Sequence, residues 1–76
     1  MYDNKITGNL IRELRKEKRI SQDVLSGLAC ISRSHLSGIE TGAINATIDT
    51  LWKISDALGI GFGELANMVE ERHPIK

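Results

Sequence analysis

The chain has 76 residues, of which 41% are apolar and 4% aromatic, and it contains one proline and one cysteine. This composition is typical of one small helical domain, and it excludes a disordered chain, an internal disulfide and a cysteine-based zinc site. A net charge of zero argues against a protein that holds nucleic acid by bulk charge alone. Because no apolar run reaches membrane-spanning length and the N-terminus lacks a signal-peptide core, we expect a cytoplasmic protein with no membrane partner.

The first predicted helix covers about residues 5–18. Its apolar residues recur at helical spacing among charged ones, at Ile6, Leu10, Ile11 and Leu14. Gly8 weakens the helix slightly, and the basic residues at its end complement the helix dipole. The segment is therefore predicted to be an amphipathic helix with one apolar face.

Two helix start signals of the same form follow. Ser21 and Ser32 each come after an isoleucine, and each hydroxyl can accept a hydrogen bond from a free amide of the next turn. The predicted helices cover about residues 22–29 and 33–41, and Gly42 ends the second. Helices this short are marginal alone in water, so each must pack against the rest of the chain.

The second of these short helices divides by face. Leu36 and Ile39 point inward, whereas the outer face is polar and almost free of bulk, carrying Arg33, Ser34, Ser37 and Gly38. A solvated helix more usually carries glutamate, lysine and glutamine there, because these residues favour the helix. An arginine among small hydroxyl residues suits a surface that approaches the edges of base pairs in a major groove.

The rest of the chain predicts two more helices, at about residues 48–58 and 62–71. Thr47 can cap the first of them, and Gly59 ends it. Its expected inward stripe is Ile48, Leu51, Ile54 and Leu58. The last helix is expected to bury Leu65, Met68 and Val69.

Three residues are candidates for a dimer interface, namely Trp52, Met68 and Val69. Trp52 lies beside the inward stripe of its helix, and two interpretations of it stay open. It either packs on the rim of the domain's own core or forms part of a dimer surface, where tryptophan is enriched.

Several segments, taken in this order and spacing, resemble the helix-turn-helix proteins of the phage repressor and Cro type, known as the Xre family. The matching segments are IRELRKEK, SQDVLS, ISRSHLSGIETG and TIDTLWKISDALGI followed by GFGEL, between about Ile6 and Leu65. Within that family, the segment SRSHLSGIE and the short chain are most similar to the controller proteins of restriction-modification systems. The resemblance implies an all-α fold over residues 1–76, a compact five-helix domain like that of lambda repressor, with the helix-turn-helix at its second and third helices.

The resemblance also implies a regulator that binds double-stranded DNA as a homodimer on a pseudo-palindromic operator. Arg33 is then expected to read guanine in the major groove, with base or phosphate contacts from Ser34, His35 and Ser37 and close approach at Gly38. His35 lies between the two faces and is as well placed to pack against Gln22. The remaining phosphate contacts are expected from Gln22, Asn45 and Thr47, although Thr47 is more simply a helix cap.

Two further expectations come from the resemblance. The arginine and glutamate that match Arg15 and Glu40 typically form an ion pair that fixes the first helix against the third. Relatives commonly have glycine where Arg19 and Cys30 stand, so either these residues adopt positive φ with some strain or the turns are rearranged.

The sequence bears on two other classes of function, a protein-binding module and an enzyme. Val24 and Leu28 lie at the edge of the second helix, where an apolar patch would suit a protein-binding module such as an antitoxin. An enzyme is disfavoured, because the few cysteine and histidine residues form no catalytic set and the sequence has no phosphate-binding loop. Neither a metal nor another cofactor nor a small-molecule ligand is implied.

Overall fold

The computed structural model describes residues 1–74. Within them the chain forms helices and turns only, so the all-α fold of five helices is confirmed. The end of each helix lies within one residue of its expected position. In chain order the helices are α1 (Asn4–Glu17), α2 (Gln22–Leu28), α3 (Arg33–Thr41), α4 (Ile48–Leu58) and α5 (Phe62–Arg72).

Short side chains determine where four of the helices begin. The side chains of Asp3, Ser21, Ser32 and Thr47 each accept a hydrogen bond from a backbone amide in the first turn of α1, α2, α3 and α4, respectively. These bonds satisfy amides that have no partner within the helix. Gly61 precedes α5 without a side-chain cap, so that helix lacks this local stabilisation.

Three helices end in the same hydrogen-bonded turn, in which one residue has a left-handed backbone. That residue is Arg19 after α1, Cys30 after α2 and Gly59 after α4, with φ of 59°, 58° and 78°. The isoleucine that follows each one donates its amide to a carbonyl five residues back, in the Ile20–Arg15, Ile31–Ser26 and Ile60–Ser55 pairs. All three isoleucines pack against the core. Of the two possibilities raised by the sequence, the structure has positive φ at Arg19 and Cys30.

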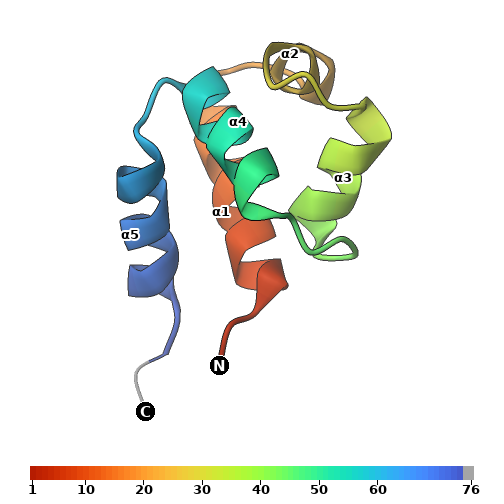
Figure 1. Cartoon of the computed structure of the whole chain (residues 1–76). Coiled ribbons are helices and arrows are strands. Elements are labelled where there is room, and N and C mark those ends of the chain that lie inside the picture. The colour runs from red at the N-terminus through yellow and green to blue at the C-terminus, as the bar shows by residue number, and fades with distance from the viewer. Residues whose placement is uncertain (75–76) are drawn as a thin grey trace.

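The main core lies where α1, α2, α3 and α4 converge, while α5 packs on α1 and α4 (Figure 1). The helices α3 and α5 lie on opposite sides of α1 (Figure 1). The buried apolar residues of this core are Ile11, Leu25, Ala29, Leu36, Ile39, Ile54 and Leu58. The two-helix segment α2–α3 is thus anchored from behind, and its outer surface is left to solvent.

Two expectations about packing need correction. Ile48 is 67% exposed and is not part of the inward stripe of α4, because it occupies the first turn, where no other helix covers it. Met68 and Val69 are only half-buried, and Leu65 is the buried residue of α5. Gly8 has a larger role than expected: a Cβ atom there would collide with the backbone carbonyl oxygens of Ile39 and Glu40. Its missing side chain therefore allows α1 and α3 to approach closely.

Candidate nucleic-acid interface

The outer surface of the two-helix segment contains a shallow polar depression. It has a volume of about 400 Å³ and is lined by Gln22 from α2 and by Arg33, Ser34 and Ser37 from α3. Arg33 and Ser34 are exposed and Ser37 is half-buried. Four of the residues expected to contact DNA thus share one concave surface, with a cationic side chain among hydroxyl and amide groups.

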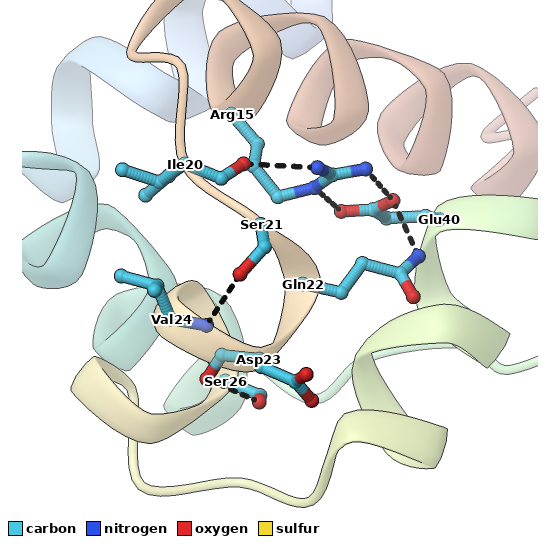
Figure 2. A network of polar contacts seen from close by, with 8 residues as sticks. All are labelled: Arg15, Ile20, Ser21, Gln22, Asp23, Val24, Ser26 and Glu40. Atoms are coloured by element: carbon cyan, nitrogen blue, oxygen red, sulfur yellow. Dashed lines mark hydrogen bonds and ion pairs between the residues drawn. The ribbon is translucent and has the colours of Figure 1, made fainter.

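A polar network lies directly behind this depression and joins α1, α2 and α3 (Figure 2). Arg15 donates to both carboxylate oxygens of Glu40, from Nε to Oε2 at 2.7 Å and from Nη2 to Oε1 at 3.0 Å. It also donates from Nη1 to the carbonyl of Ile20 at 3.0 Å. The ion pair implied by the family resemblance is therefore present, and it is bidentate.

Gln22 completes this network. Its Nε2 donates to Oε1 of Glu40 at 3.0 Å, so the amide nitrogen faces inward and the amide oxygen is turned away from Glu40 (Figure 2). The side chain that was expected to anchor phosphate thus also positions α2 against α3. This contact was not expected from the sequence.

The charge of Glu40 is buried but fully partnered, since its side chain is only 2% exposed. Burial acts to raise the pKa of Glu40, but hydrogen bonds from Arg15 and Gln22 outweigh it, together with the positive charges of Arg15 and Arg12. The pKa therefore lies below its ordinary value, and Glu40 is ionised at neutral pH. The network thus joins α1, α2 and α3 through one buried, ionised carboxylate.

Arg33 has an acidic neighbour across the turn. Its Nε lies 3.5 Å from Oδ1 of Asp23, in the first turn of α2, and both side chains are largely exposed. No periodic pattern links residues on two different helices, so this pair was not predictable from the sequence. His35 is half-buried, in agreement with its expected place between the two faces of α3.

The remaining residues expected to contact DNA lie outside the depression. The side chain of Ile44 occupies the space beside Gly38, where a Cβ atom would collide with it. The hydroxyl of Thr47 accepts from the amide of Thr50 and donates to its Oγ1 at 3.0 Å, so it caps α4. Asn45 is exposed and lines a groove that extends toward α5.

The three dimer-interface candidates divide between two apolar grooves. Val69 lines a groove of about 280 Å³ between α4 and α5, beside which Trp52 stacks on Phe62 with ring centroids 4.8 Å apart. Trp52 is 52% exposed and is not among the apolar residues that pack against the main core. Met68 of α5 lines a different groove, together with residues at the end of α1 and at the end of α4.

Neither a metal-binding cluster nor a membrane-spanning helix occurs among residues 1–74. Residues 1–74 hold no group of three or more histidine, cysteine, aspartate or glutamate side chains placed to bind a metal ion. In the same range, each helix is too short or too polar to span a membrane.

The chain is similar to a helix-turn-helix family model and to several controller proteins. The HTH_3 helix-turn-helix family model matches residues 11–65. The control protein C.MunI from a Mycoplasma species is 40% identical over 73 residues, which cover 93% of this chain and 99% of that protein. The crystal structure of the restriction-modification controller protein C.AhdI from Aeromonas hydrophila has a TM-score of 0.80 and 36% identity, covering 83% of this chain and 96% of that one.

A third comparison concerns a complex. A variant of the restriction-modification controller protein C.Esp1396I, bound to its highest affinity operator site, has a TM-score of 0.85 and 25% identity. The alignment covers 95% of each chain.

Proposed function

Because the chain belongs to the HTH_3 helix-turn-helix family of transcriptional regulators, we propose that it binds duplex DNA sequence-specifically, with α3 in the major groove. The observation that carries this proposal is the polar depression lined by Gln22, Arg33, Ser34 and Ser37. Its composition suits base edges and phosphates, and the buried Arg15–Glu40 pair holds it rigid from behind. A controller protein of the same fold is bound to an operator site in its solved structure, which supports DNA binding as the function of this fold.

Each residue of the surface has a proposed role. Arg33 reads guanine through a bidentate contact, which is the commonest specific pairing in the major groove. Ser34 and Ser37 contact neighbouring bases or phosphates, and Gln22 anchors phosphate with the free amides at the start of α2. Asn45 adds a phosphate contact from the loop after α3, whereas Thr47 acts only as a cap.

We further propose that the protein binds as a homodimer on a pseudo-palindromic site. Dimers of this type place two recognition helices one DNA turn apart, about 34 Å. The apolar groove between α4 and α5 supports the proposal, because the exposed side chain of Ile48 lines it and the exposed ring of Trp52 stacks on Phe62 at its edge. Figure 1 shows α5 on the other side of α1 from α3, so pairing through α5 and the part of α4 next to it would leave both copies of α3 free.

Selection of binding sites from random duplex DNA tests the proposal. We expect the wild-type protein to enrich a two-fold symmetric site with half-sites about ten base pairs apart. Arg33→Ala should relax selection at one position of each half-site, because that contact is worth about 1–3 kcal/mol of discrimination. Arg72→Ala on α5 removes the same charge elsewhere and should leave the selected site unchanged. If no sequence is enriched and added salt abolishes all binding, the proposal is wrong.

A protein-binding function has one observation in its favour. Val24 and Leu28 on α2 are 48% and 60% exposed, so an apolar partner has access to them. Under this alternative, Val24→Ser with Leu28→Ser should abolish capture of a protein partner while DNA binding survives. Loss of DNA binding alone would count against it.

A further inference from the structure

The contact between Asp23 and Arg33 joins the two helices of the helix-turn-helix on its outer side. Asp23 is the second residue of α2, and Arg33 is the first residue of α3. The side chains are 74% and 66% exposed, so the pair contributes little to folding. The pair is of interest for its position, because Arg33 is the cationic side chain among the residues that line the polar depression.

The atoms in contact leave Arg33 free to bind a base. Asp23 meets the guanidinium at Nε, on the side nearest the backbone, so both terminal nitrogens remain available. Two nitrogen donors are what a bidentate contact with O6 and N7 of guanine requires. Asp23 can therefore hold the arginine while it reads a base, and it restricts a side chain that otherwise samples many rotamers.

Asp23 also changes the electrostatics of the surface. A free arginine at the edge of a DNA-facing helix is attracted to any phosphate, whatever the sequence. The carboxylate of Asp23 competes for the guanidinium and cancels its charge locally. The buried Glu40 is already occupied by Arg15 and Gln22, so it does not share this role.

Resting on the function proposed above, we propose that Asp23 is a specificity-determining residue that positions Arg33 for base reading and suppresses its binding to phosphate. Asp23 need not touch DNA, and it acts through the arginine. As a consequence, the polar depression attracts DNA of any sequence only weakly, while the guanidinium of Arg33 can still donate two hydrogen bonds to guanine. Discrimination between operator and other DNA therefore depends on a residue outside α3.

The test compares the full-length protein with three single variants on two duplexes, the selected operator and a scrambled duplex of the same composition, over a range of salt. Asp23→Asn is expected to bind the scrambled duplex about 1.5- to fivefold more tightly, which is the range that one exposed ion pair is worth. The slope of log K against log salt on that duplex should steepen by about one, for the phosphate contact that Arg33 gains. Affinity for the operator should stay the same or fall, so the specificity ratio falls.

Three variants serve as controls. Glu71→Gln, at an exposed site on α5, makes the same change in net charge and should leave the specificity ratio unchanged. Asp23→Glu keeps the carboxylate and should retain most of the ratio. Asp23→Asn in an Arg33→Ala background should have almost no effect on the scrambled duplex, because the residue through which it acts is gone.

Each other outcome overturns the inference. A parallel loss of affinity for both duplexes in Asp23→Asn means that Asp23 only stabilises the start of α2. If Asp23→Asn raises affinity for the scrambled duplex equally in the wild-type and Arg33→Ala backgrounds, Asp23 only repels phosphate. If the wild-type protein itself prefers no sequence, the proposed function fails together with this inference, whereas a specific wild type with an unaffected Asp23→Asn overturns the inference alone.

Discussion

The contact between α1 and α3 and the contact between α4 and α5 are built in different ways. In the first, the missing side chain of Gly8 lets the backbone of α3 approach α1 closely. The buried charges of Arg15 and Glu40 pair with each other across the same contact. In the second, Trp52 and Phe62 stack at the edge of an apolar groove, and Ile48 is left exposed. In the first region the buried charged side chains find their partners within the chain. In the second region apolar side chains remain exposed to solvent.

This difference separates two tasks. The α1–α3 contact fixes the orientation of the helix proposed to read DNA, so geometry there must be rigid and specific. The α4–α5 face contributes apolar area without fixed polar partners, which is the character of the core of an interface between protein subunits. Substitutions in the two regions should therefore act on different quantities, the free energy of unfolding in one and self-association in the other.

The largest expected effect is that of Arg15→Ala on stability. It leaves the carboxylate of Glu40 buried without a charged partner, which should lower the free energy of unfolding by about 3–5 kcal/mol in urea denaturation. The matched control is Arg72→Ala, which breaks the bidentate pair with Glu13. That pair is exposed to solvent, so its loss should change stability far less. Equal losses in the two variants would show that the buried network does not fix α1 against α3.

Gly8→Ala is expected to rank next. Its Cβ atom would meet the carbonyl oxygens of Ile39 and Glu40, which belong to a helix and cannot rotate away. Overpacking of this kind should cost about 1–3 kcal/mol, seen as a lower Tm. Gly27→Ala on α2 has open space around the new atom and should instead gain up to about 1 kcal/mol from helix propensity. An increase in Tm in both variants would contradict the close approach of α1 and α3.

These two glycines illustrate what the sequence predicts well and what it does not. Helix bounds were predicted to within one residue, because caps such as Ser21 and Ser32 act on amides only three residues away. Gly8 was read only as a weak point in its helix, because its neighbours on α3 are more than thirty residues away along the chain. Local signals carry no information about such contacts.

The candidate site shows the same division. The polar face of α3 follows from helical periodicity, and four expected contact residues lie together. The Arg15–Glu40 pair was expected only from the family resemblance, since 25 residues separate its members. The contact of Asp23 with Arg33 and the packing of Ile44 on Gly38 depend on the angle of a turn and the path of a loop, which the sequence does not specify.

The contrasting face is tested by Trp52→Glu. A charge in place of an exposed aromatic ring should weaken the dimer by about thirtyfold or more, in keeping with the loss of about 2 kcal/mol at an interface hot spot. Sedimentation equilibrium measures the dimer dissociation constant directly. Val24→Glu is the control, because Val24 has nearly the same exposure but lies on α2. If the two variants dimerise equally well, the interface lies elsewhere.

Acid should weaken the α1–α3 contact in a predictable direction. The folded-state pKa of Glu40 is lowered, so its contribution to stability is fully present above its unfolded pKa of about 4.3 and is lost as the pH falls through the lower folded value. We therefore expect the free energy of unfolding to decrease below about pH 4.5 in the wild type. Glu40→Gln cannot titrate and should show a shallower decrease in urea denaturation between pH 3 and 7. Identical slopes would mean that Glu40 does not couple folding to protonation.

The smallest expected effect concerns the turns that end α1 and α2. A left-handed backbone costs a residue with a side chain about 1–2 kcal/mol, and glycine removes that strain. Glycine also makes the unfolded chain more flexible, which offsets roughly 0.4–1 kcal/mol of the gain. Arg19→Gly and Cys30→Gly should therefore each raise stability by about 1 kcal/mol or less. Gly59→Ala, at the equivalent position after α4, has space for its Cβ and should lower stability by a similar amount through φ alone. A loss of stability in Cys30→Gly would show that the thiol makes a contribution larger than the backbone strain, at the turn that sets the angle between α2 and α3.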